Sequence, residues 1–181
     1  YFFSGMGKTA EDSLRARDYA AEALRRETAV HAATLDEYLE GLGLRVRPAV
    51  ADEGDLDRLA QMAGKTNQFN ATTIRRSKDE FAALLANRDK RVFTFRTWDR
   101  FGEQGIVCYV VADLVTRRLT DFVMSCRAMG RTLEHFAYAY VTKNLGYAPA
   151  IDFVKTAKNR PFADFLANLR PEMKTYYKSA D

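Results

Sequence analysis

The residues best suited to chemistry lie around one cysteine, Cys126, in the stretch Leu119–Leu145. This stretch begins as an apolar strand, passes through a basic turn at Arg127–Arg131 and continues with the apolar spacing of a helix. A strand that leads into a helix through such a turn directs free backbone N–H groups and the positive end of the helix dipole at one small volume. That volume suits a phosphate, a thioester oxygen or a thiolate.

Cys126 has two interpretations. The neighbouring Arg127 and Arg131 favour the thiolate, the nucleophilic form of a cysteine, which makes Cys126 a candidate nucleophile or thioester carrier. The alternative is a small buried apolar side chain, the commonest fate of a free cysteine. Alternation along the strand does not decide which way Cys126 faces. The second cysteine, Cys108, lies inside an apolar strand and is predicted to belong to the core.

Candidate ligand-binding residues lie on both sides of this cysteine. Arg127 and Arg131 suit bidentate contacts with a phosphate or carboxylate, and their alternative is a pair of solvated or ion-paired turn residues. Asn67, Gln68 and Asn70 place amides in one loop, where they could bind amide or hydroxyl groups of a ligand or simply cap the local turn. Whether this loop meets Cys126 in space decides between the two.

The positive charge gives a weaker signal. Lys155, Lys158 and Arg160 form a small basic cluster that could dock an acidic carrier protein or be a solvated face. The net charge of +4 is mild, and the basic residues are spread among 24 acidic ones, which does not favour nucleic-acid binding.

Composition limits the class of protein. A chain of 181 residues, 47% of them hydrophobic, predicts one globular domain with an appendage. The sequence has two cysteines and two histidines, too few for a disulfide framework or a His-based metal site. No apolar run is long enough to cross a bilayer and no signal-peptide pattern is present, so we expect a cytoplasmic protein without membrane contacts. Because the chain starts at Tyr1, we also expect that an upstream part is missing.

The elements that would position these residues follow a mixed order. Residues 1–43 are predicted to form helices that end at Gly43, and from Leu44 the patterns give the order β-α-α-β-β-β-α-β-α. Three consecutive strands followed by a helix favour an α/β (α+β) fold with a mixed sheet rather than a doubly wound one. The expected strands are 44–50, 91–98, 105–112, 119–125 and 148–154, with a hairpin turn at 99–105.

Blocks of residues across most of the chain carry a family resemblance. They are Lys65–Asn70 with Thr72, Thr73 and Arg75; Asp99–Gly102 with Gly105; Met124–Arg127 with Gly130, Arg131 and Glu134; and Lys155–Asn159, preceded by Thr9, Glu11, Asp12, Arg15 and Tyr19. With these blocks, the sequence resembles the carboxy-terminal, GNAT-like (acetyltransferase-like) part of FkbH-type glyceryl transferases of polyketide biosynthesis, members of the HAD superfamily, subfamily IIIC. The resemblance implies a mostly antiparallel sheet flanked by helices.

The resemblance also implies a function. Residues 1–43 would be the linker or tail of a missing upstream HAD-type domain, and residues 44–181 a GNAT-like acyltransferase domain. Such proteins hold a glyceryl group as an enzyme thioester and pass it to the phosphopantetheine thiol of an acyl carrier protein. A phosphopantetheine or coenzyme A thioester would then be a substrate, with no tightly bound cofactor. Gly130, Lys158 and Asn159 join the candidate ligand-binding residues.

Departures from the family pattern keep alternatives open. Asp55-Leu-Asp57 lacks the threonine of the phosphatase motif and is predicted to be a solvated helix face, so no phosphatase activity is expected. The 127–131 turn is poor in glycine, and Leu166 stands where acetyltransferases commonly have a tyrosine acid; both disfavour a coenzyme A dependent N-acetyltransferase. The remaining alternative is a non-catalytic module that docks carrier protein.

Overall fold

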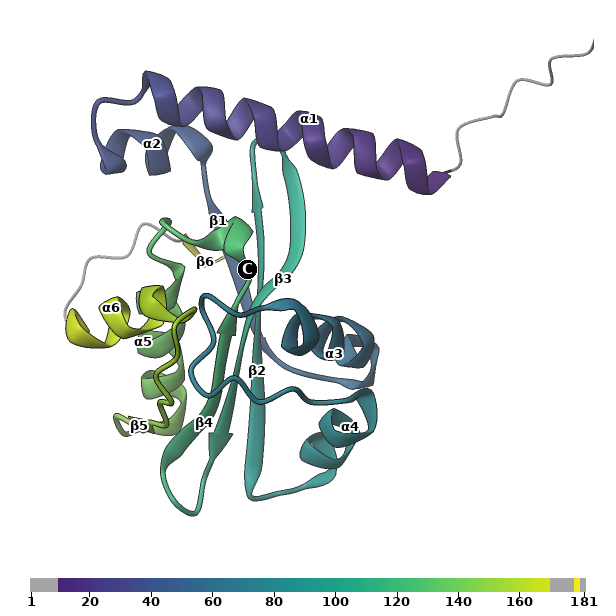
Figure 1. Cartoon of the computed structure of the whole chain (residues 1–181), viewed down its shortest axis with the longest axis vertical. Coiled ribbons are helices and arrows are strands. Elements are labelled where there is room, and N and C mark those ends of the chain that lie inside the picture. Colours follow the sequence, from purple (N-terminus) through teal and green to yellow (C-terminus); the bar gives the residue numbers. More distant parts are fainter. Residues whose placement is uncertain (1–9, 170–177, 180–181) are drawn as a thin grey trace, which may run out of the picture.

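A six-stranded sheet, in the order β5-β4-β3-β2-β1-β6, forms the centre of the protein (Figure 1). The computed structural model describes residues 10–169 and 178–179. The strands are β1 (Arg45–Val50), β2 (Lys90–Asp99), β3 (Gly102–Asp113), β4 (Arg118–Met124), β5 (Ala150–Ile151) and β6 (Lys178–Ser179). Strands β1 to β4 pair antiparallel, and β5 and β6 join the edges parallel to β4 and β1. The predicted mixed, mostly antiparallel sheet is confirmed.

Helices cover both faces of this sheet (Figure 1). Their bounds are α1 (Ala10–His31), α2 (Leu35–Leu42), α3 (Leu56–Lys65), α4 (Lys78–Ala86), α5 (Leu133–Leu145) and α6 (Arg160–Ala167), with 3-10 turns η1 (Glu53–Asp55) and η2 (Cys126–Ala128). Helices α3 and α4 bury Leu59 and Phe81 against one face. Helices α2, α5 and α6 bury their apolar residues on the other face, where Phe162 and Phe165 pack edge-on against Phe122. The predicted order from β1 to α6 is confirmed.

A β-bulge interrupts strand β3 at Val107. Phe95 pairs with Cys108, but the next residue of β2 pairs with Ile106, so Val107 is the extra residue. A bulge changes the side-chain alternation, and here Val107 and Cys108 both belong to the core on the α5 side. Ile106 belongs to the core on the α3 side.

The structure corrects several local predictions. Strand β3 begins at Gly102, so most of the expected 99–105 turn is strand. Strand β5 covers only two residues of the expected 148–154. The Asp55-Leu-Asp57 segment is not a uniformly solvated face: Asp57 is exposed, but Asp55 is 5% exposed and forms an ion pair with Arg96. Asp55 is the last residue of η1 and precedes α3, so it does not lie on the exposed face of that helix. Thr9, part of the resemblance, lies outside the described residues.

The amino-terminal helices are anchored to the sheet. Leu39 and Leu42 of α2 belong to the same core cluster as Leu44. Arg25 of α1 donates from Nε and Nη2 to the carboxylate of Asp99, at 2.7 and 3.0 Å, and both side chains are buried. Helix α1 therefore lies across one end of the sheet and extends beyond it (Figure 1). The predicted division at residue 43 remains a prediction, and the core crosses it.

We expect Arg25→Ala to lower the free energy of unfolding by about 3 kcal/mol, because it leaves the buried Asp99 carboxylate without its cation. Urea denaturation would measure the change. Arg26→Ala is the matched control: its ion pair with Glu22 is at 4.0 Å and its side chain is 80% exposed, so the loss should stay below about 0.5 kcal/mol. Equal losses for the two variants would contradict the anchoring role of Arg25.

Candidate functional site

A cleft of about 490 Å³ opens where α3 ends and β4 ends. Its walls come from the second half of α3, the loop that follows α3, and the turn that follows β4. The lining residues are Arg58, Gln61, Met62, Lys65, Thr66, Asn67, Gln68, Phe69, Met124, Ser125, Cys126 and Arg127. The side chains of Met62, Phe69 and Met124 are buried and provide an apolar floor beneath a polar rim.

The loop after α3 is held against β4 by backbone pairing. The Met124 N–H donates to the Phe69 carbonyl and the Ala71 N–H donates to the Phe122 carbonyl, each at 3.0 Å. Asn70 closes the loop internally, because its Oδ1 accepts from the Thr73 N–H and its Nδ2 donates to the Thr66 carbonyl. Asn70 is therefore a buried turn-capping residue, whereas Asn67 and Gln68 line the cleft.

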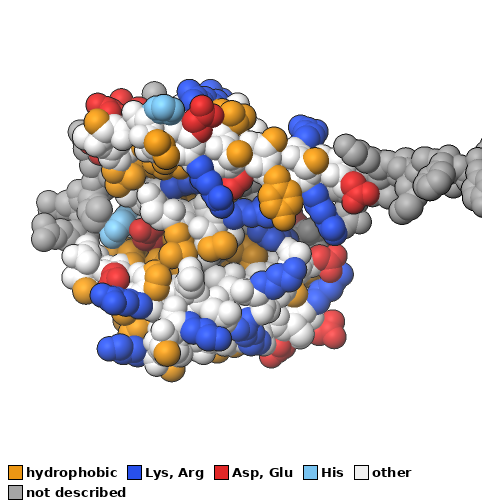
Figure 2. All heavy atoms as spheres, turned by 45° about the horizontal axis from the view of Figure 1, so that its top comes forward, with side chains coloured by type: hydrophobic (Ala, Val, Ile, Leu, Met, Phe, Trp, Pro, Cys, Tyr) orange, Lys and Arg blue, Asp and Glu red, His pale blue; other side chains and the backbone are white. Residues whose placement is uncertain are grey.

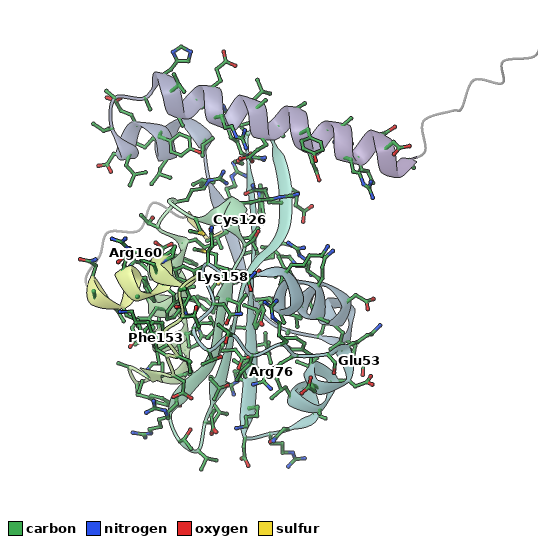
Figure 3. The ribbon with its side chains drawn as sticks, in the orientation of Figure 1. Glu53, Arg76, Cys126, Phe153, Lys158 and Arg160 are labelled. Carbon is green, nitrogen blue, oxygen red and sulfur yellow. The ribbon has the colours of Figure 1, made fainter. Side chains whose placement is uncertain are left out.

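Cys126 begins the turn that follows β4, as the label in Figure 3 shows. The Ser125 N–H donates to the Val107 carbonyl at 2.7 Å, which ends the pairing of β4 with β3. The Ser125 side chain caps η2 by accepting from the Arg127 N–H. Cys126 is exposed and lines the cleft, so its interpretation as a buried core residue is wrong. Cys108 is buried, as predicted.

Part of the expected backbone N–H cluster is used inside this turn. The Ala128 N–H donates to the Ser125 carbonyl at 3.0 Å, and the Met129 N–H donates to the Cys126 carbonyl at 3.3 Å. These two groups are therefore not available for a ligand oxygen. The apolar helix predicted after the turn, α5, begins at Leu133.

The rim of the cleft is basic. Arg58, Lys65 and Arg127 line it, and none of the described residues in the lining is acidic. Burial lowers the pKa of Arg58, and the like charge of Arg127 lowers it further. Arg127 has an acidic neighbour at 4.0 Å, Asp18 of α1, and both side chains are exposed. Figure 2 shows Lys and Arg side chains gathered around a hollow below α1.

Other predicted site residues lie away from the cleft lining. Arg131 is 5% exposed and donates to Gln104 Oε1 at 3.1 Å. Asn159 is fully buried and donates from Nδ2 to the carbonyls of Asn70 and Val154, at 3.0 and 2.9 Å. Gly130 and Lys158 are exposed, and the backbone at Gly130 has a φ of 74°, a left-handed conformation that explains the glycine. Their ligand-binding roles remain predictions.

Sequence reasoning missed Arg58, which lies opposite Cys126 in the lining. Arg58, Gln61, Met62 and Lys65 follow the i, i+3, i+4, i+7 spacing of one helix face. A mostly polar stripe of this kind is typical of a solvated helix face. Only the position of the following loop, which is set by its pairing with β4, makes this stripe the wall of a cleft.

A second hollow, of about 500 Å³, lies between α1, α2 and the β2–β3 turn. Its lining includes His31, Arg100 and Phe101, and Arg100 donates to Thr28 Oγ1 at 3.2 Å. No cysteine lines it. The Cys126 cleft is the candidate site because an exposed thiol, amides and cations meet there.

Among residues 10–169 and 178–179, no group of three or more His, Cys, Asp or Glu side chains is placed to hold a metal ion. No helix in the described part of the chain has the length and apolar character that a membrane crossing needs.

Comparison with known proteins gives structural neighbours only. No protein-family model matches the sequence, and no curated protein matches it. A mutant spermidine N-acetyltransferase from Vibrio cholerae aligns at 15% identity with a TM-score of 0.38. The alignment covers 57% of this chain and 65% of the acetyltransferase chain. A ribosomal-protein-alanine N-acetyltransferase from Brucella melitensis aligns at 10% identity and 0.48, over 72% and 95%. A possible acetyltransferase from Clostridium difficile aligns at 12% identity and 0.47, over 72% and 93%. Similarity of this degree assigns no substrate.

Alkylation tests the placement of the two cysteines. With iodoacetamide at about pH 8, we expect rapid modification of Cys126 alone in the folded protein, because burial excludes the reagent from Cys108 and raises the pKa of its thiol. The raised pKa keeps Cys108 neutral as the pH rises past the range in which an exposed cysteine ionises. Peptide mass spectrometry after timed labelling would measure both rates, and denatured protein is the control. Rapid labelling of Cys108 in the folded protein would contradict this arrangement.

Asn159 tests a structural role against ligand binding. We expect Asn159→Ala to lower the free energy of unfolding by about 2 kcal/mol, because the carbonyls of Asn70 and Val154 lose their shared donor. Asn168→Ala is the matched control, since Asn168 is exposed and bonds only within its own helix turn. Chemical denaturation measures both. A loss of carrier-protein binding by folded Asn159→Ala, without a loss of stability, would instead support the ligand-binding role.

Proposed function

We propose that this domain is an acyltransferase that accepts a thioester-linked acyl group on Cys126 and passes it to the phosphopantetheine thiol of an acyl carrier protein. The observation that supports this function is the position of Cys126: an exposed thiol in the lining of a cleft that also contains amides and cations. A free thiol in a basic, accessible environment is suited to nucleophilic exchange.

The chemistry needs no co-reactant beyond the two thiols. The Cys126 thiolate attacks the carbonyl carbon of the incoming thioester and forms a new C–S bond. The tetrahedral intermediate collapses, the original C–S bond breaks, and the departing thiolate takes the proton that Cys126 released. The same steps with the carrier thiol as nucleophile transfer the acyl group onward. Each exchange replaces one thioester by another. Arg58, Lys65 and Arg127 favour the anions of these steps, the thiolates and the tetrahedral intermediate, at the cleft.

Asn67 is the candidate donor to the acyl oxygen. Its Oδ1 accepts from the Arg75 guanidinium, which also donates to the carbonyls of Ala63 and Gly64 at the end of α3. This contact occupies the amide oxygen, so in this proposal its Nδ2 donates to a ligand in the cleft that Asn67 lines. In this proposal Asn67 takes the role that the sequence predicts for the free backbone N–H groups of the 127–131 turn. Asn67 and Gln68 also suit the hydroxyls of a glyceryl group, which is the acyl group that the family resemblance implies.

The lining disfavours the two alternatives. Acetyl transfer from coenzyme A to an amine requires a base for the ammonium and an acid for the departing thiolate, and none of the described residues that line this cleft is Asp, Glu, His or Tyr. A module that only docked carrier protein would not need an exposed cysteine beside the Asn67–Gln68 loop. The partners in this proposal are an acyl carrier protein and an upstream HAD-type domain.

Intact-protein mass spectrometry tests this function. After incubation with a glyceryl-loaded carrier protein, we expect the native chain to gain the mass of one acyl group, and Cys126→Ser to gain none. Cys108→Ala is the matched control because it removes the only other cysteine and leaves the cleft intact. An adduct that persists in Cys126→Ser, or no adduct on the native chain while carrier protein still binds, would overturn the proposal.

A further inference from the structure

Arg58 differs in its surroundings from Arg25 and Arg76, two other arginines that are at least partly buried. Arg25 and Arg76 each donate twice to a buried carboxylate, of Asp99 and Asp121 respectively, and these bonds raise the pKa of both arginines. Arg58 is half-buried, and its hydrogen bonds in the structure go to the Ile106 carbonyl and the Gln61 amide. Neither acceptor is charged. Among the described residues, Arg58 is therefore a partly desolvated cation without a carboxylate partner.

The cation is held in position rather than free to turn away. Arg58 Nε donates to the Ile106 carbonyl at 3.0 Å, and Nη1 donates to Gln61 Oε1. These bonds use one edge of the guanidinium and the Nη1 group, so Nη2 is the group left to donate to a ligand. Lys65 stands two turns further along the same helix face, in the lining of the same cleft.

Arg127 approaches Arg58 from the other wall. The two positive charges repel each other, and this repulsion lowers the pKa of Arg58. Arg127 has only a loose contact with Asp18, at 4.0 Å between two exposed side chains, which stabilises little. An anion between the walls would relieve this repulsion and supply the counter-ion that Arg58 lacks.

We propose that the Arg58, Lys65 and Arg127 side chains form a phosphate-binding subsite within the Cys126 cleft, for a ligand that carries a phosphate ester. Arginine suits the several oxygens of a phosphate better than a point cation does, and two arginines on opposite walls contact different oxygens of one group. The apolar floor of Met62, Phe69 and Met124 then faces the uncharged part of the ligand. The subsite rests on the proposed function only for the role of Cys126.

Two sources of phosphate ester fit this chemistry. One is the phosphopantetheine arm of a carrier protein, whose phosphate and thiol are parts of one ligand. The other is a small phosphorylated acid related to the glyceryl group that the family resemblance implies. The test therefore uses two pairs of probes that differ only in the phosphate: 4′-phosphopantetheine against pantetheine, and 3-phosphoglycerate against glycerate.

Isothermal titration calorimetry of each probe with the full chain is the experiment. We expect one phosphorylated probe to bind roughly tenfold more tightly than its unphosphorylated partner, and Arg58→Gln to remove that difference. Lys65→Gln, a change at an exposed residue, should weaken the same probe without affecting folding. Arg91→Gln is the matched control, because Arg91 is exposed at the end of β2 that lies away from the cleft. This variant should bind the probes like the native chain.

Each outcome decides a separate question. A preference for 4′-phosphopantetheine assigns the subsite to the carrier arm, and a preference for 3-phosphoglycerate assigns it to a small substrate. If neither phosphorylated probe is preferred, or if Arg91→Gln weakens binding as much as Arg58→Gln, the subsite is overturned even where Cys126 forms an acyl adduct. Phosphate-dependent binding without an adduct on Cys126 would overturn the proposed transfer and leave the subsite intact.

Discussion

The pairing of a loop with the free edge of β4 is the interaction on which the cleft depends. Strand β4 pairs with β5 only at Arg118 and Leu119, so its last residues would present unpaired backbone groups. The segment Phe69–Ala71 satisfies them, and its own far side is satisfied by the Val154 N–H and the Asn159 side chain. This pairing brings the end of α3 beside the turn at Cys126. Without it, the two walls would belong to unrelated parts of the surface.

The distribution of carboxylates in the protein makes the cleft basic. Elsewhere in the described chain, buried aspartates stand next to arginines: Asp99 beside Arg25, Asp121 beside Arg76, and Asp55 beside Arg96. These pairs satisfy charges that burial would otherwise penalise. The part of the cleft lining that the structure describes contains basic residues and no acidic ones, which favours an anion there. The fold thus pairs Arg25, Arg76 and Arg96 with carboxylates, whereas Arg58 in the cleft has no carboxylate partner among the described residues.

Local sequence signals predicted the elements better than the site. Apolar periodicity predicted the order of strands and helices from β1 to α6. The exposure of Cys126 could not be read from strand alternation, because the strand ends at Met124 and the cysteine already lies in a 3-10 turn. The surroundings of Arg58 and Asn159 could not be predicted from local sequence, because they are made by residues far away along the chain, at Ile106 and Asn70.

The bulge in β3 has a consequence for how this protein can change over evolution. Consecutive carbonyls at the bulge hold both walls: Ile106 accepts from Arg58, and Val107 accepts from the Ser125 N–H next to Cys126. The Arg58 cation and the turn that carries the Cys126 thiol are thus hydrogen-bonded to adjacent peptide units of the same strand. A single-residue insertion or deletion there would separate them, whereas length changes in the exposed β3–β4 turn around Val115 would leave their spacing unaltered. Related chains can therefore vary in the turn while the strand keeps its length.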